Sequence, residues 1–295
     1  MDYDGLKVLI DKGRIAAQTG RDFEIGDRVF IVTGAAQGFG YGIAAAFAAM
    51  GAKVCMADMN AQGVRDAADL LSNKYMTDVT GIKVDVSDED SVREMVFETV
   101  KHFGGLDVLV SCAGIVKAGE LQEMSKADFD QVNAVNYTGF FLCSKYASYV
   151  MKEQRQIDPE RMHDIIEINS KSGLEGSKAN FAYAGSKFGG IGLVQSFALE
   201  LASFGIKVNA ICPGNYLDGP LWNDPEKGLL KQYLEAGKTP GAKTLDDVRA
   251  FYESKVPLGR GCRVEDVVCA VKYVIEQKYE TGQAVPVTGG QVMLR

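Results

Sequence analysis

The sequence is poor in residues that many catalytic sites need. Its 295 residues include only two histidines, His102 and His163, and neither lies in a recognisable motif. We therefore expect no Ser-His-Asp triad and no zinc–histidine centre. The six cysteines are scattered without CxxC or CxxH spacing, which argues against a metal site. Free cysteines of this kind are simplest to place in a reducing compartment, the cytoplasm.

Long apolar runs and an excess of basic residues are also missing. No stretch reaches the roughly 18 apolar residues that a membrane span needs, and the N-terminus MDYDGLKVLIDKGR is charged rather than secretory. The net charge of −7 argues against non-specific binding to nucleic acid. We therefore expect neither a membrane nor a nucleic-acid partner, and an anionic substrate would need a local basic pocket.

Between residues 28 and 112 the chain alternates between two kinds of segment. Short apolar runs rich in β-branched residues have the character of strands: RVFIVTG, KVCMADM, GIKVDVS and LDVLVSCAG. Longer runs of helical character separate them: YGIAAAFAAMGA, AQGVRDAADLLSNKY and SVREMVFETVKHFG. This alternation indicates βαβ crossovers and a parallel sheet whose strands are buried on both faces.

The same alternation continues towards the C-terminus. It predicts helices near Lys126–Met151 and after Tyr183, with strands at Ile165–Ile168, in IKVNAICPG and in AVPVTGG. Pro286 cannot donate a ladder hydrogen bond, so we expect the last strand at an edge of the sheet. The sequence thus predicts an α/β protein with one doubly wound Rossmann domain over 28–295, in which helices cover both faces of seven parallel strands.

The first 27 residues fall outside this alternation. Leu6, Leu9 and Ile10 can form a short apolar face that packs on the body of the protein or on a partner subunit. A loosely held tail is an equal alternative.

Residues 215–257, between the sixth and seventh strands, also fall outside it. They carry two helix-start signals, Asp224–Pro225 and Thr244 with Asp247 three residues on. A helical insertion at the carboxyl edge of the sheet would form a lid over a substrate. The alternative is that its apolar residues are simply packed; these are Tyr216, Leu221 and Trp222.

The stretch TGAAQGFG, Thr33 to Gly40, follows the first strand and opens the first helix. Glycines at its positions Gly34, Gly38 and Gly40 allow a tight turn and a close approach of the backbone to a pyrophosphate at the helix N-terminus. A glycine cluster alone is weak evidence, but the strand–turn–helix context is the one expected of a dinucleotide site.

Asp58 stands at the end of the second predicted strand, 20 residues after Gly38. A carboxylate there accepts hydrogen bonds from the adenosine ribose and repels a 2′-phosphate. Gln37 and Met59, beside these positions, carry no positive charge. The sequence therefore favours NAD over NADP, with a solvated loop acid as the alternative interpretation of Asp58.

The stretch YAGSK places Tyr183 and Lys187 four residues apart, which is one turn on a helix. A phenol is a poor acid or base near neutral pH, because its pKa is about 10. A neighbouring ammonium favours the phenolate and lowers that pKa. The pair is therefore a candidate for proton transfer, with surface decoration as the alternative.

Taken in order, these motifs resemble those of the short-chain dehydrogenase/reductases, over residues 28–295. The further matching positions are Asp85–Val86, Ala113–Gly114 in SCAG, Asn136 in AVNYTG, Ser170 in INSKSG and Pro213–Gly214. Two departures stand out. Ser111 and Cys112 replace both asparagines of the family's NNAG segment, and NYLDG lacks the family's threonine after Pro-Gly. They leave the local hydrogen bonds and the contact with the nicotinamide amide unassigned.

The resemblance implies hydride transfer between a substrate alcohol or carbonyl and NAD. Tyr183 would be the base in oxidation and the acid in reduction, while Lys187 lowers its pKa and binds the nicotinamide ribose. Ser170 would hold the substrate oxygen, and Asn136 a water that links Lys187 to solvent. The residues implied to contact the cofactor are Gly34, Gln37, Gly38, Phe39, Gly40, Asp58, Met59, Asp85, Val86, Ala113, Gly114, Tyr183, Lys187, Pro213 and Gly214.

Within the family, INSKSG, GSK, KFGGIGL, VPLGRGC and VTGGQVM resemble the bacterial sorbitol-6-phosphate 2-dehydrogenases, which interconvert sorbitol 6-phosphate and fructose 6-phosphate with NAD. This resemblance implies a phosphate subsite near Ser170 and Tyr183. Lys171 is the first candidate for it, and the others are Lys117, Lys178, Arg260 and Arg263. Each of these cations can instead be a solvated surface residue.

Two other functions stay open at this point. One is a dehydrogenase of the same family that acts on a non-phosphorylated polyol or on another secondary alcohol or ketone. The other is a dinucleotide-binding protein without catalysis, against which the complete Asn-Ser-Tyr-Lys set argues. The helices near Lys126–Met151 and Tyr183–Ala202 are apolar around most of their circumference. In the family these helices pair between subunits, which implies a homotetramer or a homodimer.

Overall fold

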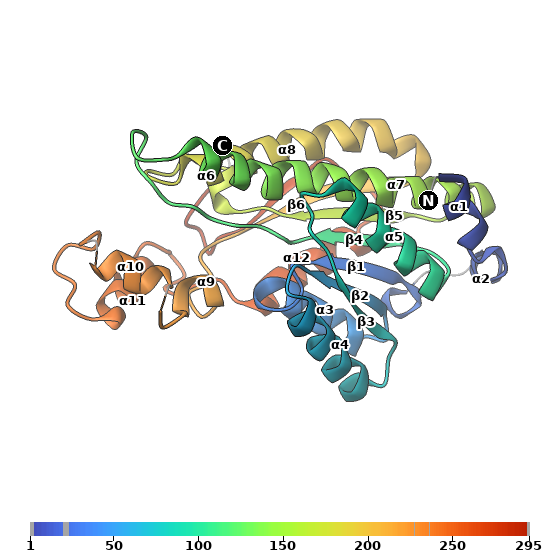
Figure 1. The fold of residues 1–295 in the computed structure, drawn as a ribbon, viewed down its shortest axis with the longest axis horizontal. Helices are drawn as coiled ribbons and strands as arrows, with labels where there is room; N and C mark the ends of the chain where they lie inside the picture. The colour runs from blue at the N-terminus through green and yellow to red at the C-terminus, as the bar shows by residue number, and fades with distance from the viewer. Residues whose placement is uncertain (1–2, 20–23, 227, 236, 294–295) are drawn as a thin grey trace.

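The computed structural model describes residues 3–19, 24–226, 228–235 and 237–293. Seven parallel strands form one sheet in the order β3-β2-β1-β4-β5-β6-β7 (Figure 1). Their bounds are β1 Val29–Thr33, β2 Lys53–Asp58, β3 Val79–Lys83, β4 Val108–Ser111, β5 His163–Ile168, β6 Ile206–Pro213 and β7 Ala284–Val287. The predicted doubly wound sheet is confirmed, and β7, which contains Pro286, is an edge strand as expected.

Helices cover both faces of this sheet (Figure 1). One face packs against α5 (Glu89–Phe103), α7 (Gly139–Ile157) and α8 (Phe181–Leu201), and the other against α3 (Gly38–Ala49), α4 (Ala61–Tyr75) and α12 (Val264–Glu276). Each layer closes a separate apolar core. The strand order reverses between β1 and β4. Sheets of this kind bind ligands beyond the carboxyl ends of the strands at such a reversal.

Several shorter elements complete the chain. A π-helical segment, Ala134–Thr138, joins α6 (Lys126–Asn133) to α7, and short 3₁₀ turns cover Ile25–Asp27, Lys171–Gly173 and Ala202–Phe204. Among the described residues, no helix has both the length and the apolar character that crossing a membrane requires.

The N-terminal segment packs onto the body of the domain. It forms α1 (Tyr3–Leu9) and α2 (Lys12–Gln18), which lie beside α7 (Figure 1). Its buried apolar residues join the core on that face of the sheet: Leu6, Ile10 and Ile15. Asp11 caps α2, because its side chain accepts the backbone N–H of Arg14 at 2.9 Å. The sequence left open whether this segment packs on the body, packs on a partner subunit or forms a loose tail. In the described residues it packs on the body.

The segment between β6 and β7 is helical, as predicted. It contains α9 (Pro220–Asn223), α10 (Leu229–Glu235) and α11 (Leu245–Ser254), which project from one end of the molecule (Figure 1). These helices enclose a small core of their own. The predicted cap at Thr244 is present: its side chain accepts the N–H of Asp247, whose carboxylate accepts the N–H of Thr244.

Two helix starts differ from the sequence-based expectation. Asp224–Pro225 opens a turn, because the Asp224 side chain accepts the N–H of Glu226 at 2.9 Å and α10 begins only at Leu229. An aspartate that bonds the backbone two residues on favours a turn over a helix. Helix α8 begins at Phe181, so Tyr183 lies within its first turn rather than ahead of it.

Neither histidine lies at the carboxyl edge of the sheet. His163 is fully buried at the start of β5, where its Nε2 meets Gln154 at 2.9 Å and burial lowers its pKa to about 3. The ring is therefore neutral at physiological pH. His102, on the surface of α5, lies 3.0 Å from Asp78.

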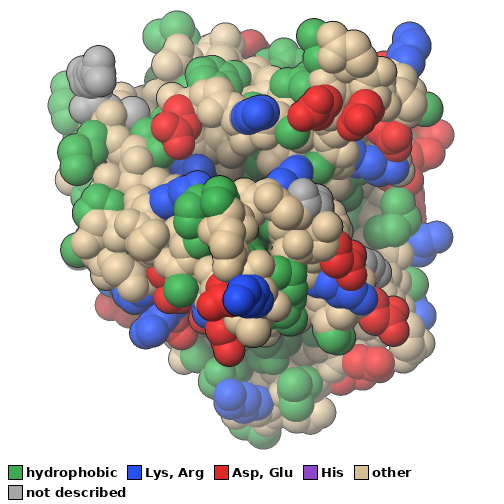
Figure 2. Space-filling view, turned by 90° about the vertical axis from the view of Figure 1, so that its left-hand side faces the viewer, with side chains coloured by type: hydrophobic (Ala, Val, Ile, Leu, Met, Phe, Trp, Pro, Cys, Tyr) green, Lys and Arg blue, Asp and Glu red, His purple; other side chains and the backbone are tan. Residues whose placement is uncertain are grey.

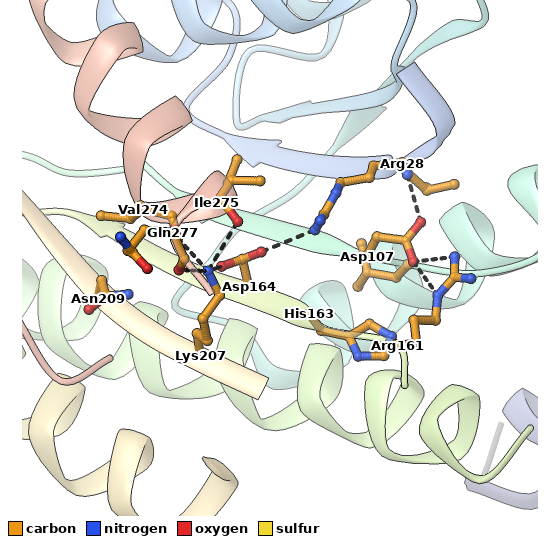
Figure 3. Close-up of polar contacts among 12 residues, drawn as sticks. Arg28, Asp107, Arg161, His163, Asp164, Lys207, Asn209, Val274, Ile275 and Gln277 are labelled. Carbon is orange, nitrogen blue, oxygen red and sulfur yellow. Dashed lines mark hydrogen bonds and ion pairs between the residues drawn. The ribbon is translucent and has the colours of Figure 1, made fainter. Parts of the chain in front are cut away.

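Buried charges gather at the opposite, amino edge of the sheet (Figure 3). Asp164, near the start of β5, pairs with Arg28 at 3.1 Å and with Lys207 at 3.0 Å. Asp107, just before β4, pairs with Arg161 at 2.7 Å. All five side chains are buried. Removing one partner of such a pair leaves an uncompensated charge in the interior and is strongly destabilising. The cluster therefore holds the first residues of the central strands in place.

Lys207 also closes the end of helix α12 (Figure 3). Its ammonium donates to the carbonyl oxygens of Val274, Ile275 and Gln277. The last carbonyls of a helix lack partners within the helix and carry its negative dipole end. One cation therefore stabilises both the helix end and the buried carboxylate of Asp164.

Replacing Lys207 by methionine keeps the apolar stem and removes the ammonium. The variant leaves three carbonyls without this donor and Asp164 with one cation fewer. We expect it to lose about 3–5 kcal/mol of unfolding free energy, measured by denaturant titration. Lys272→Met, on the same helix, is the control: its ammonium pairs with Glu276 at the surface and should contribute about 0.5 kcal/mol or less. Equal stability of the two variants would contradict this account of Lys207.

Candidate active site

The glycine turn after β1 needs its glycines for steric reasons. Gly34 and Gly38 have φ angles of +66° and +63°, which residues other than glycine rarely adopt. A Cβ atom on Gly40 would lie 2.1 Å from the carbonyl oxygen of Gly34. Helix α3 begins at Gly38, so its free N–H groups face the carboxyl edge of the sheet. The turn is therefore a cradle in which a dinucleotide pyrophosphate fits.

Asp58 lies beside this cradle at the end of β2. Its two carboxylate oxygens accept the backbone N–H groups of Ala36 at 3.0 Å and Asn60 at 2.9 Å. Each oxygen keeps a free lone pair, so the carboxylate can also accept a ribose hydroxyl. The neighbouring Gln37 and Met59 are exposed and uncharged.

Asp85–Val86, which the resemblance implies contacts the adenine of the cofactor, follows β3. It lies close to Asp58, whose carbonyl accepts the N–H of Val84 at 2.9 Å. The Asp85 carboxylate accepts from the N–H and hydroxyl of Ser87, and Val86 is buried. On the other side of the sheet centre, Pro213 ends β6, and the N–H of Gly214 donates to β7. These segments therefore lie on the same edge of the sheet as the glycine turn.

The segment that replaces the family's NNAG is held by the end of strand β1. The hydroxyl oxygen of Thr33, the last residue of β1, accepts the backbone N–H groups of Cys112 at 3.0 Å and Ala113 at 3.1 Å. A Cβ atom on Gly34 would lie 2.9 Å from the Cα atom of Ala113. The Ala113–Gly114 backbone thus lies against the glycine turn without the two asparagines.

Asn136 lies in the π-helical segment between α6 and α7, and such segments are frequent at functional sites. Its side-chain amide accepts the N–H of Ile115 at 2.9 Å and donates to the carbonyl of Ile115 at 3.0 Å. It also donates to the hydroxyl of Ser186 at 3.1 Å. The side chain therefore joins the loop after β4 to helix α8, and its role in holding a water stays a prediction.

Tyr183 and Lys187 lie one turn apart on α8. The ammonium of Lys187 is buried and donates to the carbonyl of Ile168 at 2.8 Å, and it lies 3.6 Å from the carboxylate of Glu167. Burial on its own would lower the pKa of Lys187, but Glu167 and then Tyr183 outweigh it and raise that pKa. Lys187 is therefore a cation at physiological pH, placed to favour the phenolate of Tyr183.

Ser170 lies two residues after the end of β5 and is partly exposed. Its N–H donates to the side-chain oxygen of Asn169 at 2.8 Å, and its hydroxyl oxygen accepts the N–H of Ser172 at 3.1 Å. These contacts fix the hydroxyl at the start of the loop that leads into α8. The hydroxyl hydrogen is free to donate to a substrate oxygen.

Most of the cations considered for a phosphate already have carboxylate partners. Lys117 pairs with Asp128, Arg260 with Asp266, and Lys171 with Glu175, at 2.6, 2.6 and 3.6 Å. Within the described parts of the chain, the other two, Lys178 and Arg263, are exposed and form no side-chain ion pair. Arg263 nevertheless lies close to Asp266, which accepts its backbone N–H at 2.9 Å. Lys178 lies on the loop between Ser170 and Tyr183. The end of the molecule that carries the insertion shows interspersed basic and acidic side chains, so a phosphate would depend on local cations (Figure 2).

The insertion touches the glycine turn through two aromatic rings. Phe39 and Tyr216 are stacked, with ring centroids 4.6 Å apart and planes 21° apart. Trp222 is instead buried in the core of the insertion, against Tyr233 and Tyr252. For Trp222 the packing alternative is therefore the one observed, and Leu221 is half exposed.

Sequence reasoning missed the residues that support the site from beneath. These are Thr33, Glu167, Asn169 and Ser186. A signal for Glu167 was present in DIIEINS, where a charged residue interrupts an apolar strand. Such a residue is rarely fully buried without a partner. Its partner, Lys187, is 20 residues away in the sequence, so the pattern alone does not reveal the pair.

The fold and this site define an oxidoreductase that uses a nicotinamide dinucleotide. The family model described as short chain dehydrogenase matches residues 28–224, and the chain belongs to this family. It is 37% identical over 271 residues to sorbitol-6-phosphate 2-dehydrogenase of Escherichia coli (strain K12), covering 90% of this chain and 99% of that protein.

Two further comparisons show how widely this fold is used. The crystal structure of sorbitol-6-phosphate 2-dehydrogenase from Erwinia amylovora has a TM-score of 0.82 and 38% identity, covering 90% of this chain and all of that one. A 3-oxoacyl-[acyl-carrier-protein] reductase of Thermotoga maritima is 31% identical over 272 residues, with 90% and 98% covered. The family therefore defines the reaction class, and the substrate needs a separate argument.

Proposed function

We propose that this enzyme interconverts sorbitol 6-phosphate and fructose 6-phosphate with NAD. The observation that carries the proposal is the similarity to two sorbitol-6-phosphate 2-dehydrogenases over essentially their full length. Almost the whole length of each relative is covered, and in α/β folds the loops at the carboxyl edge recognise the substrate. The positions of Ser170, Tyr183 and Lys187 around that edge support the same chemistry.

The proposed mechanism assigns one task to each side chain. When bound, the nicotinamide accepts a hydride from the substrate carbon in oxidation and returns it in reduction. Tyr183, as phenolate, takes the hydroxyl proton of the alcohol while the C–H electron pair leaves with the hydride. Lys187 stabilises that phenolate, and Ser170 donates a hydrogen bond to the substrate oxygen. In the reverse direction Tyr183 returns the proton to the carbonyl oxygen.

The choice of NAD follows from the charge beside the adenosine ribose. Asp58 would accept hydrogen bonds from both ribose hydroxyls and repel a 2′-phosphate. Gln37 and Met59 provide no cation that would compensate for that repulsion. Gly34, Gly38 and Gly40 would receive the pyrophosphate, and this group is common to both dinucleotides.

For the phosphate of the substrate we propose Lys178 in place of Lys171. The ammonium of Lys171 faces Glu175 and is mostly covered, whereas Lys178 is exposed on the loop that links Ser170 to Tyr183. An ammonium without a carboxylate partner attracts phosphate as a point charge. Helices α9 to α11 would close over the substrate as a lid and exclude water from the hydride path.

We also propose that the enzyme is a homotetramer or homodimer of the cytoplasm. Helices α7 and α8 expose large apolar side chains that one subunit leaves open to water: Phe141, Phe188 and Leu199. Contact between the same helices of two copies would cover them. Light scattering of the purified protein measures the assembly directly.

A substrate panel tests the proposal. With NAD, we expect kcat/KM for sorbitol 6-phosphate to exceed that for sorbitol by at least tenfold, because a charge-assisted contact contributes about 1.5–3 kcal/mol. Lys178→Met should remove most of this difference. Lys126→Met, an exposed lysine on α6, is the matched control and should leave it intact. Faster turnover of free polyols or of another alcohol would favour the alternative within the family.

Tyr183→Phe tests the assignment of the proton-transfer group. The variant keeps the ring but cannot accept or donate the proton, so we expect kcat to fall by about 100-fold or more. NADH binding, measured by fluorescence titration, should be retained. Tyr279→Phe, at a fully exposed position, should behave as the wild type. Full activity of Tyr183→Phe would refute the role of Tyr183, and a wild-type protein without turnover on any alcohol would favour a non-catalytic dinucleotide-binding protein.

Asp58→Ser tests the choice of cofactor. The serine removes the negative charge and one of the two acceptor oxygens next to the ribose. We expect the ratio of kcat/KM with NAD to that with NADP to fall by at least tenfold. An unchanged ratio would mean that Asp58 is a solvated loop acid.

A further inference from the structure

Glu167 is a buried carboxylate directly beneath the candidate active site. It lies on β5, two residues before Asn169, and its side chain is 1% exposed. One oxygen, Oε1, faces the ammonium of Lys187 at 3.6 Å, and the other, Oε2, accepts from the amide of Asn169 at 2.8 Å. Burial raises the pKa of Glu167, while Lys187 and Asn169 act against that rise, so the negative charge of this carboxylate depends on these partners.

The packing leaves room for this network. A Cβ atom on Gly190 of α8 would lie 2.4 Å from Oε1 of Glu167, and one on Gly173 would lie 2.1 Å from the side-chain oxygen of Asn169. Any larger residue at these two positions would displace the polar groups. The two glycines therefore allow α8 and the loop after Ser170 to close over a charged pair.

Asn169 extends the network to the reacting groups. Its amide donates to the backbone carbonyl of Lys187 at 2.9 Å as well as to Glu167, and its oxygen accepts the N–H of Ser170. Through Asn169, Glu167 is thus linked to the backbone of both Lys187 and Ser170.

The other ionisable groups that face Lys187 cannot replace this charge. They are Tyr183 on the same helix, Cys112 after β4 and Cys212 on β6. Burial raises the pKa of each thiol to about 12, so both are neutral in the working range. Within the described residues, Glu167 is the carboxylate that faces the Lys187 ammonium.

We propose that Glu167 is a positioning residue that sets the pH range of the reaction by acting on Lys187 and Tyr183. Its negative charge keeps Lys187 protonated and partly offsets the positive charge that Tyr183 experiences. This inference rests on the proposed roles of Tyr183 and Lys187.

The direction of the effect follows from removing one negative charge. Without it, the protonated forms of Tyr183 and Lys187 both become less stable relative to their deprotonated forms. Oxidation needs the phenolate of Tyr183 and the ammonium of Lys187. In a plot of kcat/KM for oxidation against pH, the acidic limb reports the deprotonation of Tyr183. The alkaline limb reports the deprotonation of Lys187. Both limbs should therefore move to lower pH.

Glu167→Gln tests this inference, because it keeps the size of the side chain and removes the charge. We expect the kcat/KM profile for alcohol oxidation to move to lower pH by about one unit. Glu167→Asp restores the charge and should return the profile towards that of the wild type. Glu175→Gln, which removes an exposed carboxylate from the loop after Ser170, is the control and should leave the profile in place.

A second measurement needs neither cofactor nor turnover. Tyrosinate absorbance of the free protein is titrated with and without Tyr183→Phe, and the difference isolates one phenol among the 12 tyrosines. In the Glu167→Gln background this difference should titrate at lower pH. If Glu167→Gln does not fold, Gly190→Ala takes its place, since the new methyl group displaces Oε1 and should shift the titration in the same direction.

The outcomes separate this inference from the proposed function. A rate that falls equally at every pH, with an unmoved tyrosinate titration, would reduce Glu167 to a structural residue and overturn the inference. Full turnover of Tyr183→Phe would instead overturn the assignment of Tyr183 on which it rests. A shift of both the rate profile and the titration to lower pH supports it.

Discussion

The rest of the site depends on the contacts that the buried ammonium of Lys187 makes with strand β5. A cation in such a place needs partners within the protein. The carbonyl of Ile168 and the carboxylate of Glu167 supply them, and both belong to β5. The contact therefore holds helix α8 against this strand. Because Tyr183 lies one turn before Lys187 and Ser170 follows the end of β5, the same contact places the side chains that the proposed chemistry uses.

Strand β5 carries a buried carboxylate near each end. Asp164 pairs with Lys207 at the amino edge of the sheet, and Glu167 pairs with Lys187 at the carboxyl edge. A shift of this strand by one residue would turn its side chains to the opposite faces and leave both carboxylates buried without their partners. Stability and site geometry thus depend on one register, which the amino-edge pair supports from outside the active site.

Features that depend on local sequence could be predicted, and features that depend on distant contacts could not. The seven strands, the glycine turn and the cap at Thr244 each follow from residues within one short stretch. The Asp224–Pro225 start was wrong because the aspartate bonds a turn instead of a helix. Glu167 was missed because its partner comes from another element, and Trp222 could not be assigned to the insertion core before α10 and α11 were placed beside it. Which residue pairs with a buried charge becomes clear only when the fold brings distant elements together.

The side chains of the proposed reaction and the helical insertion belong to different parts of this chain. Tyr183 and Lys187 lie on helix α8, and Ser170 lies just beyond the end of β5, where hydrogen bonds fix it. Side chains held by rigid elements in this way support a shared reaction across relatives that differ in substrate. The insertion instead has its own small core and meets the glycine turn through the stacked rings of Phe39 and Tyr216. Phe39 belongs to the turn that would hold the dinucleotide, so a shift of that ring on binding would be transmitted to the insertion. The stacked rings therefore link the insertion physically to the dinucleotide cradle, whereas the proposed proton-transfer residues belong to neither element.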